Sequence, residues 1–151
     1  MRFYVTKGIG VCEDGLVSFD RALQTANLGN YNLVKISSIL PPNTARSEAI
    51  DAPEGTFLHT AYSVKQSKTI GANIFALIAV GIPMNSNKIG VIMEYSGEGD
   101  IEEGKKRVAE MVTTSMGDRG IAIREIVIDG VNTTVQNAGG ITTVLAAISI
   151  W

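Results

Sequence analysis

The sequence predicts an α+β fold, a sandwich in which a largely antiparallel or mixed sheet is covered by packed helices. Several segments have the composition of strands and two have helical periodicity, and their irregular order does not fit a strict alternation of strand and helix. The length of 151 residues suits one domain with a proper core. We therefore expect a single domain over residues 1–151.

The first third of the chain is expected to alternate between extended and helical segments before a long polar loop. Weak alternation of apolar residues indicates strands, and an apolar stripe flanked by a serine and a glycine indicates a capped helix. In order, we predict a strand at 2–11, a helix at 19–28 with Ser18 as N-cap and Gly29 as stop, a strand at 32–40 ended by Pro41 and Pro42, and a loop at 43–55.

The rest of the chain is expected to be mostly strands around one longer helix. Residues 74–80 are continuously apolar, which is typical of a strand that is covered on both faces. We predict strands at 56–65, 72–82 and 88–95, a turn at 97–99, a helix at 101–116 with Asp100 as N-cap and Gly117 as stop, strands at 121–128 and 141–150, and a polar, turn-prone segment at 129–140 with room for a short strand.

The charge pattern argues against two classes of partner. The net charge is −2, and the one basic cluster, residues 105–107, follows Glu102 and Glu103 in the predicted helix, where pairing within the helix explains it. The longest apolar stretch, residues 74–82, is too short to span a membrane. We therefore expect a cytoplasmic protein that binds neither nucleic acid nor membranes.

Cysteine and histidine are nearly absent from the chain. Cys12 is the sole cysteine and His59 the sole histidine. An intrachain disulfide is therefore impossible, and neither residue belongs to a cluster with metal-ligand spacing. We expect no metal site, and we expect His59 to be a half-buried strand residue.

A serine pair, Ser37 and Ser38, interrupts the apolar strand predicted at 32–40. A buried hydroxyl costs free energy unless it finds a hydrogen-bond partner. Two interpretations follow: the pair marks a bend whose hydroxyls are satisfied, or it serves chemistry.

Two acidic residues have similar alternatives. Glu94 ends an apolar strand, either as a terminus where the charge reaches water or as a partly buried acid whose raised pKa suits proton donation. Asp20 lies near the start of the predicted helix, where the macrodipole favours an acid. Its functional alternative is a carboxylate that binds a cationic substrate.

Together these residues resemble the pyruvoyl-dependent arginine decarboxylase family over nearly the whole chain. The blocks that carry the resemblance are the Phe19-Asp20 pair, Asn32-Leu33-Val34-Lys35-Ile36-Ser37-Ser38-Ile39-Leu40-Pro41-Pro42, Thr60-Ala61-Tyr62, Gly90-Val91-Ile92-Met93-Glu94-Tyr95-Ser96-Gly97 and the small-residue run that ends at Trp151. The resemblance implies a precursor that cuts itself between Ser37 and Ser38. Its products would be residues 1–37 (the β chain) and 38–151 (the α chain), with a covalent pyruvoyl group derived from Ser38.

The resemblance also implies an activity and a set of site residues. The enzyme would convert L-arginine to agmatine and CO2 through a Schiff base on the pyruvoyl group, with neither pyridoxal phosphate nor metal. Glu94 would donate the proton, Asn32 would assist processing and substrate binding, Ser37 would bind substrate, and Asp20 would recognise the guanidinium.

The family is built from trimers, and a reach argument agrees with this. Asn32 and Ser38 would lie about 20 Å apart in a regular strand. We therefore expect Asp20 and Asn32 to serve the pyruvoyl group of an adjacent protomer in a homotrimer; pairing of trimers into hexamers is left open. Two alternatives stay open: the same machinery acting on lysine or ornithine, and an oligomeric domain that neither cleaves nor catalyses.

Overall fold

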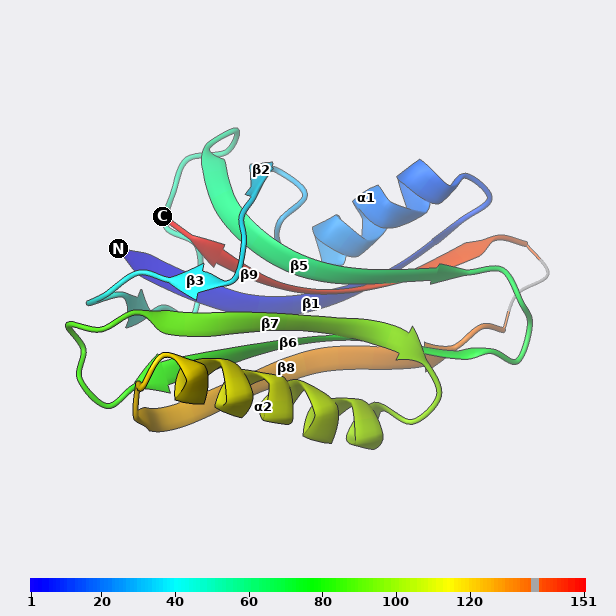
Figure 1. The fold of residues 1–151 in the computed structure, drawn as a ribbon. Coiled ribbons are helices and arrows are strands. Elements are labelled where there is room, and N and C mark those ends of the chain that lie inside the picture. Colours follow the sequence, from blue (N-terminus) through cyan, green and yellow to red (C-terminus); the bar gives the residue numbers. More distant parts are fainter. Residues whose placement is uncertain (137–138) are drawn as a thin grey trace.

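The computed structural model describes residues 1–136 and 139–151, and these residues form four layers (Figure 1). Two sheets face each other, α1 covers the outer face of one sheet, and α2 covers the outer face of the other. The elements are β1 (Arg2–Cys12), α1 (Gly15–Thr25), β2 (Asn32–Lys35), β3 (Ile39–Leu40), β4 (Ala45–Arg46), β5 (Phe57–Ser67), β6 (Asn73–Pro83), β7 (Gly90–Glu98), α2 (Ile101–Asp118), β8 (Ile123–Thr134) and β9 (Ile141–Ile150).

The described strands form a five-stranded sheet in the order β2-β5-β9-β1-β4 and a four-stranded sheet in the order β3-β7-β6-β8. Neighbours are antiparallel except for two pairs, β1 with β4 and β2 with β5, which are parallel. The predicted α+β fold with a mixed sheet and packed helices is therefore confirmed. The short strand β4 lies within the segment 43–55 that was predicted as a loop.

The main core lies between the two sheets, where side chains such as Ile78, Ile92 and Ile148 are fully buried. A second cluster lies under α2 and a third under α1. The continuously apolar β6 is covered on one face by the facing sheet and on the other by α2, as its sequence predicts.

Helix α1 begins earlier than predicted because Asp14, not Ser18, is its N-cap. The Asp14 carboxylate accepts hydrogen bonds from the backbone N–H groups of Leu16 (2.9 Å) and Val17 (3.0 Å). Ser18 is fully buried inside the helix. Its hydroxyl lies 2.8 Å from the carbonyl of Ile141 and 2.6 Å from the Thr143 hydroxyl, so it joins α1 to the start of β9.

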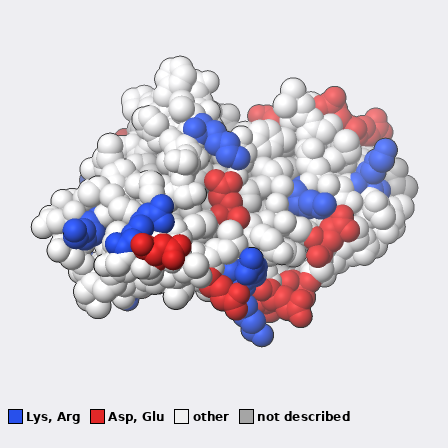
Figure 2. All heavy atoms as spheres, viewed as in Figure 1, with Lys and Arg blue, Asp and Glu red and all other residues white. Residues whose placement is uncertain are grey.

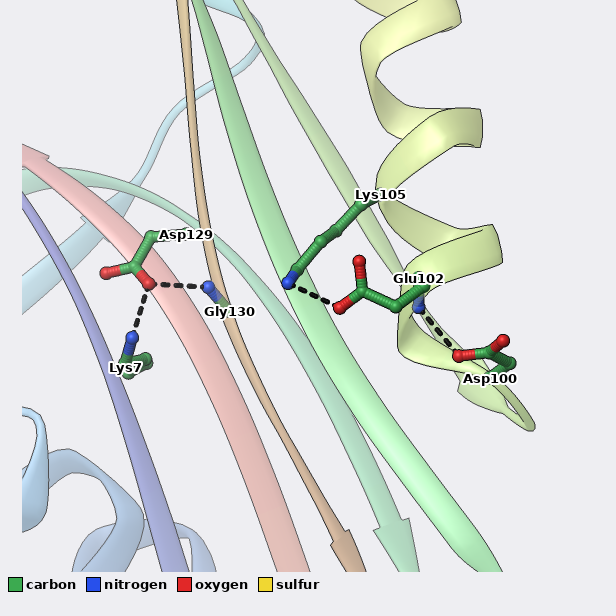
Figure 3. Close-up of polar contacts among 6 residues, drawn as sticks. All are labelled: Lys7, Asp100, Glu102, Lys105, Asp129 and Gly130. Carbon is green, nitrogen blue, oxygen red and sulfur yellow. Dashed lines mark hydrogen bonds and ion pairs between the residues drawn. The ribbon is translucent and has the colours of Figure 1, made fainter.

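Helix α2 has the predicted cap but extends past its predicted end. Asp100 accepts a hydrogen bond from Glu102 N at 2.9 Å, and Lys105 Nζ lies 2.7 Å from the Glu102 carboxylate (Figure 3). Within the basic cluster, Lys105 thus pairs with a preceding acid at i,i+3, whereas Arg107 pairs with the following Glu110 at 3.7 Å. Gly117 lies within the helix, and the following turn contains Gly120 at φ +63°.

Strand β8 continues into the segment 129–140, which was predicted to be turn-prone with room for a short strand of its own. Residues 129–134 pair with β6 as far as Thr134 opposite Asn73, because β6 offers its backbone along that whole length. The Asp129 carboxylate accepts from Gly130 N at 2.8 Å and from Lys7 Nζ at 2.6 Å, which joins β8 to β1 across the two sheets (Figure 3). Residues 137–138 of the predicted turn lie outside the described residues.

The strand predicted at 32–40 is two strands in different sheets. β2 pairs with β5 in the five-stranded sheet, and β3 pairs with β7 in the four-stranded sheet. The segment between them crosses from one sheet to the other (Figure 1, cyan). This crossing places Ser37 and Ser38 in the segment that joins the five-stranded sheet to the four-stranded sheet.

Across the part of the chain that the structure describes, every helix is too short or too polar to traverse a bilayer. Acidic and basic side chains are interspersed on the face shown in Figure 2.

Candidate active site

Ser37 and Ser38 lie where the chain bends between the two sheets, outside the paired segments of β2 and β3. Ile36 N donates to Thr60 O of β5 at 3.2 Å, and the Ser38 carbonyl accepts from Ile92 N of β7 at 2.7 Å. The backbone on each side of the serine pair is therefore held by a different sheet. The bend interpretation describes the geometry, and the chemical interpretation stays a prediction.

Glu94 lies on the β7 face that looks toward the five-stranded sheet. Ile92, two residues earlier on the same face, is fully buried in the core between the sheets. Ser96, two residues later, donates from its hydroxyl to Val64 O of β5 at 3.0 Å. Glu94 therefore occupies the boundary between the apolar core and the polar edge, in the middle of β7 rather than at a strand end as predicted.

Burial and a neighbouring cation act on Glu94 in opposite directions. Its side chain is 27% exposed, and burial raises the pKa of the carboxyl group above its ordinary value. The ammonium of Lys35, 3.7 Å from Oε2, partly offsets this by lowering the pKa. The direction of the net shift agrees with the interpretation of Glu94 as a partly buried acid.

Lys35 and Tyr62 complete the surroundings of Glu94, and neither was singled out from the sequence. The Lys35 ammonium lies 4.6 Å from the centroid of the Tyr62 ring. A detectable signal was present, since a lysine between Val34 and Ile36 in an apolar strand is unusual. Both residues border a hollow of about 310 Å³, whose full lining is Lys35, Tyr62, Ser63, Val64, Glu94, Tyr95 and Ser96.

A second hollow, also of about 310 Å³, lies beside Ser37 and is mostly apolar. His59 is part of its lining and is exposed, not half-buried as predicted. The scissile bond predicted from the sequence thus borders space in which a small molecule could fit.

Asp20 and Asn32 lie apart from this group within one chain. Asp20 is in the middle of α1, not in its first turn, and its carboxylate accepts from Gln24 Nε2 at 2.6 Å beside a different hollow. The Asn32 amide donates to Gly55 O at 2.8 Å, at the opposite end of β2 from the serine pair. The structure therefore brings the Ser38 backbone and the strand of Glu94 together, but does not bring Asp20 or Asn32 to them.

A sequence model of the family described as pyruvoyl-dependent arginine decarboxylase (PvlArgDC) matches residues 2–151. The chain belongs to this family. Curated relatives named pyruvoyl-dependent arginine decarboxylase include one from Methanococcus aeolicus, 38% identical over 95% of this chain and 86% of the relative. Others come from Methanocaldococcus jannaschii (37%, over 92% and 82%) and Thermococcus kodakarensis (37%, over 86% and 84%).

Membership of the pyruvoyl-dependent arginine decarboxylase family implies a covalent pyruvoyl group, and the crossing segment fits it. A pyruvoyl group needs a serine whose N-terminal neighbour can be released while the fold persists. At Ser38 the preceding residues are held by β5 and the serine itself by β7, so both new ends would keep their backbone partners. Within residues 1–136 and 139–151, the acidic, histidine and cysteine side chains do not gather in groups of three or more that could hold a metal ion.

Proposed function

We propose that this chain cuts itself between Ser37 and Ser38 and then decarboxylates L-arginine to agmatine and CO2. The observation that carries the proposal is the hydrogen bond from Ile92 N to the Ser38 carbonyl. It holds Ser38 against β7 two residues from Glu94, which is about 7 Å along a strand. A carbonyl group formed at residue 38 would therefore lie near a partly buried carboxyl group.

Self-cleavage requires both heavy atoms of the Ser38 side chain, Cβ and Oγ. Its Oγ attacks the Ser37 carbonyl carbon, and the acyl group moves from nitrogen to oxygen, which gives an ester and a free amine. Elimination breaks the Cβ–Oγ bond and releases Ser37 as a carboxylate, leaving dehydroalanine at residue 38. Addition of water and loss of ammonia give the pyruvoyl group. A residue without a β-hydroxyl lacks the nucleophile and the leaving group.

The pyruvoyl carbonyl and the Glu94 side chain would have distinct tasks in decarboxylation. A pyruvoyl carbonyl supplies an electron sink for the electrons left behind by departing CO2. Glu94, whose pKa is raised by burial, donates a proton to the substrate carbon that has lost CO2.

Asp20 and Asn32 take part through a neighbouring copy of the chain in a homotrimer. Their separation from Glu94 within one protomer supports this part of the proposal, as does the length of β2 between Asn32 and the serine pair. Across a subunit boundary, the Asp20 carboxylate would accept two hydrogen bonds from the guanidinium. Mixed assemblies of Asn32→Ala and Ser38→Ala protomers test it: intact sites should regain activity, and hybrids that stay inactive would contradict a shared site.

The proposed function is tested first by the intact mass of the purified chain. We expect two species that meet at the bond between Ser37 and Ser38, the larger with a blocked N-terminus, whereas Ser38→Ala stays full-length. The cleaved protein should release CO2 and agmatine from L-arginine. A full-length chain without turnover would favour the non-cleaving domain, and faster turnover of lysine or ornithine would replace arginine as the substrate.

A further inference from the structure

Lys35 makes two contacts that favour one position of its ammonium group. It lies 3.7 Å from the Glu94 carboxylate and 4.6 Å from the centroid of the Tyr62 ring. Tyr62 in turn contacts Phe19 of α1, with ring centroids 6.1 Å apart. A lysine side chain that is free in water loses considerable rotamer entropy on ordering, so two attractive partners favour a defined position.

We propose that Lys35 is a positioning residue for decarboxylation: its ammonium, seated on the Tyr62 ring, orients the Glu94 carboxyl group at the edge of the hollow. This inference rests on the function proposed above, in which Glu94 donates a proton. It assigns a task to a residue that would not itself touch the substrate.

Lys35 supplies one of the two opposing effects on the pKa of Glu94. A proton donor works best when its pKa lies near the working pH, because it must both hold a proton and release it. Burial alone would raise the pKa of Glu94, and Lys35 limits that rise. Without the ammonium, Glu94 would hold its proton more tightly.

Other charged or titratable side chains near Glu94 come from β5 and β7. They are Tyr62 and Lys65 on β5 and Tyr95 and Glu98 on β7, while β6, which pairs with β7 here, has uncharged side chains. Lys65 Nζ lies 3.3 Å from Glu98 Oε1, so that pair joins the same two sheets as Lys35 and Glu94 do. Among these groups, Lys35 is the one whose charge acts on Glu94.

The position of Lys35 in the sequence adds a consequence. Lys35 lies before the proposed cut and Glu94 after it, so the ion pair would join the two products of cleavage. The short product would then contribute directly to the acid–base properties of the site.

The pairs offer a matched set of variants. Lys35→Met removes the charge but keeps much of the aliphatic stem over Tyr62, Lys35→Arg keeps the charge, and Lys65→Met removes the equivalent charge from the Glu98 pair. All are compared per cleaved chain, with cleavage measured by intact mass. Because Glu94 must be protonated to donate, kcat falls as pH rises through its pKa. In Lys35→Met this fall should move to higher pH. Lys35→Arg and Lys65→Met should retain the wild-type profile.

A second measurement does not depend on activity. In the uncleaved Ser38→Ala chain, labelled with ¹³C at glutamate carboxyl groups, NMR titration gives the pKa of Glu94, with Glu94→Gln identifying its signal. Adding Lys35→Met should raise that pKa, and adding Lys65→Met should leave it unchanged. An unmoved pKa, or an unmoved kcat profile in an active enzyme, would overturn the role of Lys35. A wild-type chain that fails to cleave or to turn over arginine would instead refute the proposed function, while the NMR titration would still decide whether Lys35 acts on Glu94.

Discussion

Replacing Glu94 by glutamine removes proton donation while it keeps nearly the whole shape of the side chain. Glutamine has nearly the same shape as glutamate but cannot donate a proton to carbon. The side chain is 27% exposed and its partner Lys35 is 57% exposed, so solvent screens the ion pair. Losing such a pair costs about 0.2–1 kcal/mol of folding free energy. The Glu94→Gln chain should therefore fold.

The effect on catalysis should be far larger than the effect on stability. General acid catalysis by a positioned side chain contributes roughly 100- to 10,000-fold to a rate. This range corresponds to about 3–5 kcal/mol of barrier. We expect kcat of Glu94→Gln for arginine to fall by this factor, while the unfolding midpoint in denaturant changes little.

The assay measures CO2 release per cleaved chain, since the cleaved fraction from intact mass corrects for any loss of processing. Glu98→Gln is the matched control, because Glu98 lies on the same strand and also pairs with a lysine between the two sheets. It should keep wild-type kcat. A cleaved, folded Glu94→Gln enzyme with wild-type kcat would refute the assignment of Glu94 as proton donor.

Two further predictions concern the scaffold, and chemical denaturation measures both. Gly104 and Gly117 both lie in α2, but a Cβ on Gly104 would come within 2.8 Å of Leu77 Cδ1, whereas nothing lies within 4 Å of one on Gly117. Gly104→Ala should therefore destabilise the fold by about 1–3 kcal/mol, and Gly117→Ala should stabilise it by about 0.5–1 kcal/mol; equal effects would contradict the packing of α2 on β6. Ser18→Ala should cost about 1–3 kcal/mol because it removes a buried hydroxyl that joins α1 to β9. The exposed Ser86→Ala is its control, and a Ser18→Ala chain as stable as that control would show that these hydrogen bonds contribute nothing.

The sequence predicted correctly those elements that are determined by the residues within them, such as apolar strands and capped amphipathic helices. β6 and β9 were predicted from apolar runs, and Asp100 from its place before an amphipathic helix. The prediction of Ser18 as the N-cap of α1 was wrong because Asp14 and Ser18 are both residue types that cap helices well. The choice between them depends on β9, more than 120 residues away, which receives the Ser18 hydroxyl.

The candidate site also contains features that the sequence indicates and features that it does not. The partial burial of Glu94 was one of two alternatives that the sequence left open, because an acid at the end of an apolar run can either reach water or stay partly buried. The crossing at residues 36–38 could not, because residues 32–40 have one continuous apolar pattern. The pairing of β2 with β5 and of β3 with β7 decides where that run divides. The role proposed for Lys35 depends on the same crossing.

The location of β1 within the five-stranded sheet has a consequence for the life of the mature protein. β1 lies between β9 and β4, and it would belong to the short product of cleavage. That product could leave only if the sheet opened, so the cut enzyme would persist as two chains under native conditions. Once denatured, however, the two chains would have to find each other again, and refolding would become a second-order reaction that slows on dilution. The uncut precursor, by contrast, folds as a single chain. Because the two mature chains would recombine slowly when dilute, the durability of the mature enzyme would be governed by its unfolding rate.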